Sequence, residues 1–276
     1  MTATQISPTD LGPVAAGVEH RSPLSWAVRD SRTITWRNLV SITRQPQLIV
    51  FSTIQPIIFV LMFTYVFGGA IHIPGPYPYV DYLMPGIFCQ TVVFGSINTG
   101  IGLSDDLQKG LIERFRSLPM ARSAVLAGRT VADLVRNVFV VALMLIVGFA
   151  VGFRVQTNVF GLIAGIAVLL LFAFSMTWIF AIVGLSAPSP ETAQAMSFPI
   201  LAPLVFASSA FVSTSTMPGW LQVFANHQPV TAAVNATRAL MLGGPTATYV
   251  WQSLAWSVGI VAVFAPLAIR RYRRVA

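Results

Sequence analysis

Long stretches of this chain carry no charged side chain, and short charged segments separate them. Each stretch is close to the roughly 20 residues that a helix needs to cross about 30 Å of hydrocarbon. The third is the shortest, and it begins at Leu134 only if Arg136 snorkels to the membrane surface. The pattern predicts six spans near residues 48–67, 82–103, 134–152, 159–185, 195–212 and 249–269.

The composition explains what surrounds these helices. Of the 276 residues, 55% are hydrophobic and only 9% are charged, whereas soluble domains carry roughly 25% charged residues. A water-facing surface needs ionic groups, so lipid must be the solvent for most of this surface. The single cysteine, Cys89, excludes a disulfide within the chain and a thiolate metal cluster. The predicted fold class is an all-α integral membrane protein.

The basic residues are distributed unevenly. All 17 lysines and arginines except Arg154 and Arg238 lie in the N-terminal segment, in the loop between the second and third spans, or at the C-terminus. Cytoplasmic loops carry an excess of basic residues, and six spans place these three regions on one side. Both termini are therefore predicted to be cytoplasmic. The net charge of +8 then reflects orientation, not nucleic-acid binding.

Two segments precede the first span. Residues 1–23 contain prolines and glycines but no apolar core, so we expect a flexible cytoplasmic tail and not a signal peptide. Residues 24–44 mix Trp26 and Trp36 with arginines. This mixture indicates either a helix at the membrane interface or an ordinary basic flank of the first span. The rest of the chain, 45–274, is predicted to form one transmembrane domain.

The largest predicted cytoplasmic loop contains an amphipathic helix. Ser104 can cap its start, Asp105 and Asp106 suit the positive end of a helix, and Pro119 ends it. This helix either rests on the membrane or its own bundle, or docks into a groove of another protein. Its apolar stripe, at helical spacing, consists of Leu107, Leu111, Phe115 and Leu118.

Two patches of sequence resemble a known family. The first is ERFRSLPMARSAVLAGR, from Glu113 to Arg129, and the second is MPGWLQVFANHQPVTAAVNATRALMLGG, from Met217 to Gly244. Both are similar to ABC type-2 exporter permeases, in particular the daunorubicin/doxorubicin-resistance group. The start of the first span and the Pro-Gly-Ile at Pro85 fit as well, so the resemblance covers roughly residues 25–274.

The resemblance implies the roles of three segments. The loop helix becomes the coupling helix that contacts a separate ATP-binding subunit, and residues 24–44 become a connecting helix at the membrane surface. Residues 217–242 become short helices that dip into the outer leaflet. The implied contacts with the ATP-binding subunit are Glu113, Arg114, Phe115, Arg116, Leu118 and Pro119.

The composition of the segment before the last span also favours an external re-entrant structure. Residues 213–237 are uncharged and moderately apolar, but Pro218 and Pro229 interrupt them, so they suit neither a span nor a free loop. Trp220 lies near the start of this segment. Arg238 follows it and either binds a lipid phosphate or anchors the segment at the interface.

Three further polar residues have two interpretations each. Glu191 lies in a short cytoplasmic turn and is either a second contact with the ATP-binding subunit or part of an ordinary helix start. In the second span, Gln90 and Asn98 either line a transport pathway or hydrogen-bond to a neighbouring helix.

The energy source for transport is predicted to lie outside this chain. No GxxxxGK[ST] phosphate-binding loop occurs. The predicted span cores also lack the acidic, basic and histidine side chains that couple protons to transport. We therefore expect no catalytic residue, cofactor or metal site in this chain, and we expect ATP and Mg²⁺ to bind a partner subunit.

These features predict the permease subunit of an ATP-driven exporter in the cytoplasmic membrane of a bacterium. Two permease chains, identical or paralogous, would pair with two ATP-binding subunits among membrane lipids. The cargo would be a hydrophobic or amphipathic drug or lipid, and no nucleic acid would bind. The alternative is an ion-gradient-driven carrier, or a lipid-handling membrane protein, that works without an ATPase partner.

Overall fold

The structure is a computed structural model that describes residues 46–71, 77–110 and 122–275. Every regular element in these ranges is helical, as predicted. The elements are α2 (Pro46–Leu61), η2 (Met62–Phe67, a π-helix), α3 (Tyr79–Gln108), α5 (Arg122–Val151), α6 (Val159–Ser186), α7 (Pro190–Phe206), η3 (Thr214–Thr216, a 3-10 helix), α8 (Gly219–Asn226), α9 (Pro229–Leu242) and α10 (Thr246–Val275).

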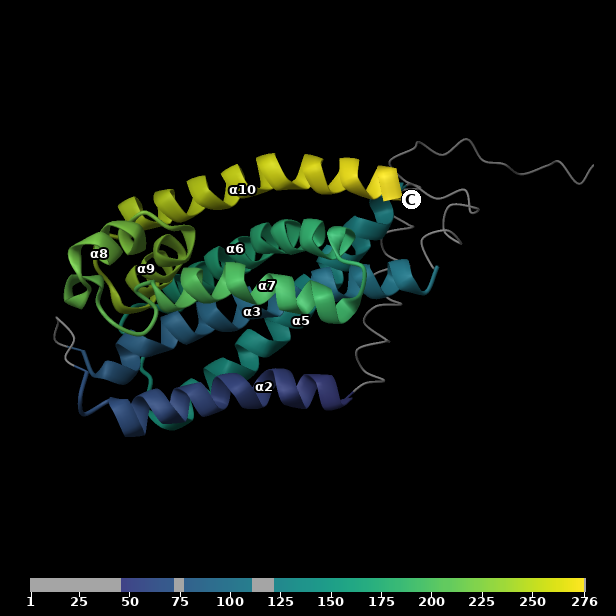
Figure 1. The fold of residues 1–276 in the computed structure, drawn as a ribbon. Coiled ribbons are helices and arrows are strands. Elements are labelled where there is room, and N and C mark those ends of the chain that lie inside the picture. Colours follow the sequence, from purple (N-terminus) through teal and green to yellow (C-terminus); the bar gives the residue numbers. More distant parts are fainter. Residues whose placement is uncertain (1–45, 72–76, 111–121, 276) are drawn as a thin grey trace, which may run out of the picture.

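The long helices form one bundle in which successive helices run in opposite directions (Figure 1). Helix α3 packs against α5, α6, α7 and α9, while α10 packs on α6 and α9, and α2 contacts α3 and α5. Figure 1 shows α2 and α10 on opposite outer sides. The start of α2 and the end of α10 lie at one end, which we call the terminal end. Helices α8 and α9 lie at the other, which we call the capped end.

Local sequence explains several helix boundaries. Asn158 caps α6 by accepting a hydrogen bond from the Gly161 N–H at 2.8 Å. Gly110 and Gly152, with φ of 63° and 109°, follow the ends of α3 and α5. Glycine adopts this left-handed conformation without the steric penalty that a Cβ brings. The backbone can therefore turn away from the helix axis directly after each helix.

All six predicted ranges coincide with helices, but the boundaries differ. Helices α3, α5 and α10 extend beyond the predicted spans at both or one of their ends. The fifth prediction is wrong at its C-terminal side because α7 stops at Phe206 and not at residue 212. Pro199 and Pro203 lie inside α7, and each removes a backbone donor from its second half.

The predicted start of a new helix at Ser104 is also wrong. Helix α3 continues through Ser104 to Gln108, so Asp105 and Asp106 lie near the C-terminal end of a helix and not at a cap. Asp105 pairs with Lys109 at 2.7 Å, and Asp106 pairs with Arg129 at 2.5 Å. Because these cations satisfy the carboxylates, the charges do not end the helix.

Within the described residues, four helical segments are long and apolar enough to cross a membrane: α3, residues 128–151 of α5, α6 and α10. Helices α2 and α7 have 16 and 17 residues, fewer than the roughly 20 that span the hydrocarbon. The π-helix η2 continues α2 directly, however. The chain is therefore a multi-pass membrane protein by helix length and composition, and the count of six crossings stays a prediction.

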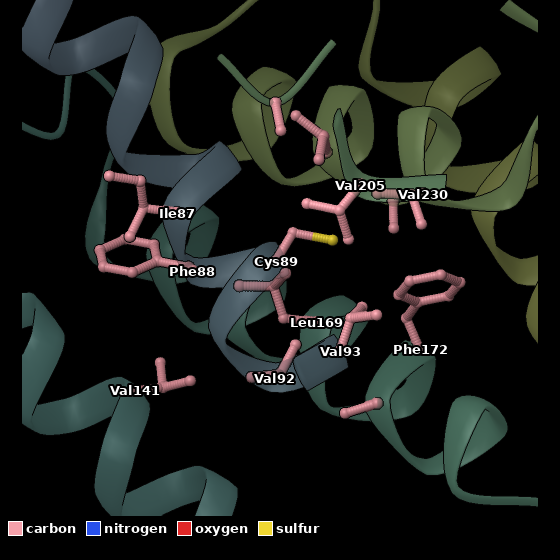
Figure 2. Packing of buried hydrophobic residues seen from close by; sticks show 14 of the residues in the cluster. Ile87, Phe88, Cys89, Val92, Val93, Val141, Leu169, Phe172, Val205 and Val230 are labelled. Atoms are coloured by element: carbon pink, nitrogen blue, oxygen red, sulfur yellow. The ribbon is translucent and has the colours of Figure 1, made fainter. Parts of the chain in front are cut away.

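Apolar side chains fill the space around the middle of α3. Cys89 is fully buried, and Figure 2 shows its sulfur pointing toward Val205 of α7 and Val230 of α9. Leu169 and Phe172 of α6 belong to the same buried cluster. Several helices therefore enclose the middle of α3, which runs from one end of the bundle to the other.

Candidate functional site

The six predicted coupling residues, from Glu113 to Pro119, lie outside the described residues, as does the predicted interfacial helix at 24–44. The structure does describe the two helices that flank the coupling segment. Helix α3 ends at Gln108 and α5 begins at Arg122, both at the terminal end (Figure 1). We call the residues nearest the loop on α3 and α5 its two stems.

One largely buried ion pair and one hydrogen bond to a carboxylate join α3 and α5 near the loop. Arg129 of α5 donates to Asp106 of α3 at 2.5 Å, and the two side chains are only 19% and 11% exposed. Farther along the helices, Thr99 Oγ1 of α3 donates to the carboxylate of Asp133. Arg136 lies 3.7 Å from the other oxygen of Asp133. Charged and polar side chains of both helices therefore meet along one helix–helix contact.

Arg136, whose snorkelling was the condition for starting the third span at Leu134, lies against α3. Its guanidinium donates to the backbone carbonyl of Gly95 on α3 at 2.5 Å, and this carbonyl together with Asp133 stabilises the charge inside the protein. Asp133 lies just before the predicted third span and Arg136 lies near its start, whereas the rest of α5 after Arg136 carries no charged residue.

Glu191 lies in the first turn of α7, where it is exposed. Ser189 caps this helix by accepting a hydrogen bond from the Thr192 N–H at 3.2 Å. Hydrogen bonds from the backbone N–H of Glu191 and from Ser189 hold the pKa of the Glu191 carboxyl below its usual range. An ordinary helix start therefore accounts for Glu191, and its contact with a partner stays a prediction.

The turn before α7 lies beside the first stem of the loop. Ser104 Oγ donates to the carbonyl of Ala187 at 3.3 Å, and Gln108 Nε2 donates to the carbonyl of Pro188 at 3.2 Å. Both donors belong to the last turns of α3. The structure thus brings the turn that precedes Glu191 beside the end of α3, the helix that leads into the predicted coupling segment.

Gln90 and Asn98 lie on α3 in different surroundings. Gln90 is buried, and its Oε1 has no hydrogen-bond partner within the described residues. Asn98 is exposed and donates to the carbonyl of Gly95 at 3.1 Å. Phe94 and Ile101, which lie on the same side of α3 by helical spacing, are partly exposed. Asn98 is therefore accessible to a cargo or a second chain, whereas Gln90 is enclosed.

The predicted re-entrant segment consists of two short helices. Pro218 directly precedes α8, and Pro229 is the first residue of α9, a position where its missing N–H costs nothing. Trp220 on α8 is 76% exposed, as expected for a side chain at a membrane interface. Helix α9 packs against α3, α6 and α10. With 14 residues it is too short to cross the membrane.

Arg238 of α9 is engaged within the protein. Its guanidinium donates to the carbonyls of Tyr82 at 3.1 Å and Ser209 at 2.8 Å, and to Asn235 Oδ1 at 3.1 Å. It also lies 3.6 Å from the centroid of the Tyr82 ring. Arg238 therefore links α9 to α3 and to the turn after α7, a role that neither prediction for this residue included.

Further hydrogen bonds close the capped end, and the sequence reading missed them. The carboxylate of Asp81 accepts from the Arg154 N–H at 2.8 Å and from Gln156 Nε2 at 3.2 Å. The hydroxyls of Tyr77 and Tyr79 donate to the carbonyls of Leu242 and Phe211 at 2.9 and 3.1 Å. The sequence signal that could have indicated these bonds is the cluster of tyrosines near the start of the predicted second span.

This architecture, apolar helices with paired charges at one end and a hydrogen-bonded cap at the other, defines a multi-pass membrane protein. The model of the ABC-2 type transporter family matches residues 29–242. The match covers most of the chain, so this protein belongs to the ABC-2 type transporter family, and the resemblance found in the sequence is confirmed.

Relatives in this family are named as drug-resistance permeases. The chain is 39% identical over 247 residues to the daunorubicin resistance ABC transporter permease protein DrrB1 of Streptomyces coeruleorubidus, covering 90% of this chain and 87% of that protein. It is 28% identical to the probable doxorubicin resistance ABC transporter permease protein DrrC of Mycobacterium tuberculosis, over 82% of each chain. A putative transport permease, ycf38 of Pyropia yezoensis, is 24% identical over 83% of this chain and 76% of its own length.

Proposed function

We propose that this chain is the transmembrane permease subunit of an ATP-driven exporter that uses a separate ATP-binding subunit. The observation that carries the proposal is the family match, which runs from residue 29 to 242 and so includes the loop between α3 and α5. Residues 113–119 of that loop form the contact with the ATP-binding subunit, and Glu191 adds a second contact nearby. ATP and Mg²⁺ bind the partner and not this chain.

The assembly contains two permease chains and two ATP-binding subunits in the cytoplasmic membrane of a bacterium. Both termini face the cytoplasm, because the basic residues cluster at the N-terminal segment, the α3–α5 loop and the C-terminus. Six crossings then place the terminal end at the cytoplasmic surface and α8 and α9 at the outer surface. The short helices α8 and α9 form a re-entrant segment in the outer leaflet.

The cargo is a hydrophobic or amphipathic molecule, either a drug or a lipid. Most of the surface of the long helices is apolar, and Asn98 lies on an accessible side of α3. The names of the daunorubicin- and doxorubicin-resistance relatives favour a drug-like compound. Such a cargo can approach the bundle from the membrane without crossing a charged surface.

An ion-gradient-driven carrier is the competing function. Buried carboxylates occur in α5 and α3, but Asp133 is bonded by Thr99 and Arg136, and Asp106 is paired with Arg129. Each of these carboxylates is thus engaged in a contact within the bundle. The buried charges in this part of the chain therefore favour a structural role over proton coupling.

Reconstitution decides between the two functions. We expect the chain with its ATP-binding subunit to move doxorubicin, used as a probe, into inside-out proteoliposomes only when ATP and Mg²⁺ are added. The chain alone should transport nothing under a proton gradient. Gradient-driven uptake by the chain alone would overturn the proposal.

Replacing Glu113 or Leu118 with alanine should reduce ATP-dependent uptake about tenfold, because each removes a contact in the coupling segment. Membrane insertion and chain abundance should be unchanged. The matched control is Leu171→Ala, which truncates an exposed apolar side chain of α6 far from the loop. Normal uptake by both loop variants would contradict the assignment of the coupling contacts.

The predicted topology places Ser215 outside and Lys109 inside. In a Cys89→Ala background, a membrane-impermeant maleimide added to intact cells should label Ser215→Cys but not Lys109→Cys. Both positions are exposed, so a reactive thiol at either is accessible from its own side. Permeabilised cells, in which both should react, provide the control. Labelling of position 109 alone in intact cells would show the opposite orientation.

A further inference from the structure

The contact between α3 and α5 contains a series of polar interactions that we call the α3–α5 ladder. Its members follow one another in opposite order along the two helices, as expected for antiparallel neighbours. Asp106 pairs with Arg129, Thr99 donates to Asp133, and the Gly95 carbonyl accepts from Arg136. The members are Gly95, Thr99 and Asp106 on α3, and Arg129, Asp133 and Arg136 on α5.

Glycines on α3 make room for the arginines of α5. A Cβ at Gly102 would overlap the guanidinium of Arg129, and a Cβ at Gly95 would lie 3.2 Å from Arg136 Nη2 and 2.9 Å from Asn137 Oδ1. The spacing of seven residues places Gly95 and Gly102 on one side of α3. The arginines therefore lie flat against the helix backbone, and α3 cannot rotate or slide without displacing them.

Stability alone does not explain this arrangement. Removing two charges from water costs free energy that their mutual attraction often only offsets. Replacing a buried ion pair by apolar residues of similar volume is often neutral or stabilising, so apolar residues could join the helices equally well. What an ion pair adds is directionality, because it fixes one register between two helices.

The register of these two helices matters because they are the stems of the coupling loop. Asp106 lies two residues before the end of α3, and Arg129 lies seven residues after the start of α5. The next turns of α3 continue into the enclosed core, and Gly100 of α3 touches the backbone of α6 at Phe180. The ladder is thus the rigid connection between the loop and the centre of the bundle.

We infer that the α3–α5 ladder is a set of positioning residues that transmits the movement of the coupling loop to the bundle. This inference rests on the proposed function. When the ATP-binding subunit displaces the loop, the ladder makes α3 and α5 move together as one unit. Without it, the two stems slide past each other, and ATP hydrolysis continues without moving α3 relative to the other helices.

The test uses the complete permease with its ATP-binding subunit in proteoliposomes, and doxorubicin as the probe. The main variant is Asp106→Leu with Arg129→Met, which removes both charges and retains apolar contact. We expect this variant to assemble with the ATP-binding subunit. It should hydrolyse ATP at nearly the wild-type rate and with an unchanged KM for ATP. The number of doxorubicin molecules moved per ATP should fall about tenfold.

Two further variants keep the test independent of folding. Gly102→Ala leaves all charges in place but displaces Arg129, so it should also lower the transport-to-hydrolysis ratio. Asp105→Asn is the matched control, because Asp105 is adjacent in sequence and pairs only with the exposed Lys109 on its own helix among the described residues. Its ratio should equal that of the wild type.

The outcomes separate this inference from the proposed function. ATP-driven transport by the wild type together with an unchanged ratio in the double variant would overturn the ladder's role and leave the exporter intact. A loss of transport and hydrolysis in the same proportion, matching a loss of assembled complex, would also overturn it, because the ladder would then only support folding. Absence of ATP-dependent transport by the wild type would remove both proposals.

Discussion

Replacing Arg238 with methionine should lower the free energy of unfolding by about 3 kcal/mol, because buried acceptors that lose their donor cost about 1–3 kcal/mol each. The carbonyls of Tyr82 and Ser209 both lose a hydrogen bond from the guanidinium, and Asn235 loses another. In a chain of this size, 3 kcal/mol corresponds to a decrease in Tm of roughly 6–12 °C. The decrease in Tm is measured by thermal unfolding of the detergent-purified protein, monitored by intrinsic fluorescence.

The control for this prediction is Arg154→Met at the same capped end. The Arg154 side chain is exposed, and it donates to the carbonyls of Phe149 and Phe153 near the end of α5. Its replacement should change Tm little. Arg238→Lys should be intermediate, because an ammonium cannot reproduce the fork of donors that reaches both carbonyls. Equal Tm values for Arg238→Met and the wild type would show that the guanidinium does not hold α9 to α3.

Arg238 also shows why the candidate sites were only partly predictable. The sequence identified it as an unusual charge beside an apolar segment. Its acceptors, the carbonyls of Tyr82 and Ser209, are distant in the chain and are backbone atoms, which no pattern of side chains reveals. The sequence consequently suggested lipid or interface contacts, whereas the structure shows contacts within the bundle.

The helices were more predictable than their ends. Each of the six apolar runs coincides with a helix in the described residues, although only four of these helical segments are long and apolar enough to cross a membrane. Several boundaries failed where a charge was used as a stop signal. Helix α3 continues past Asp105 and Asp106 and α5 starts before Arg129, because a partner satisfies each of these charges. Pairing of this kind depends on packing across helices and is not visible in local sequence.

Replacing Gly184 with leucine should prevent the bundle from folding normally. The backbones of helices α3 and α6 lie close together where Gly100 and Gly184 face each other. A Cβ at Gly184 would come within 2.6 Å of the Cα of Gly100, and a Cβ at Gly100 would come within 2.5 Å of the carbonyl oxygen of Phe180. These neighbours are backbone atoms, which cannot rotate aside as a side chain can. The helices must therefore separate.

We expect Gly184→Leu to cost about 3 kcal/mol or more, at the upper end for overpacked sites, because separation also opens the core around α3. The fraction of protein that elutes as a single folded species from size-exclusion chromatography should fall sharply. Gly184→Ala should have a smaller effect in the same direction. The matched control is Gly259→Leu on α10, where a Cβ meets nothing within 4 Å.

The position of Gly100 makes this prediction informative about transport as well as folding. The neighbouring residue Thr99 donates a hydrogen bond to Asp133 of α5. The same turn of α3 therefore contacts α6 through Gly100 and α5 through the Thr99 hydroxyl. Moving α3 away from α6 should therefore strain the α3–α5 contact too. If Gly184→Ala folds, its transport per ATP should decrease along with its Tm. A lower Tm with an unchanged transport ratio would show that the two faces of α3 act independently.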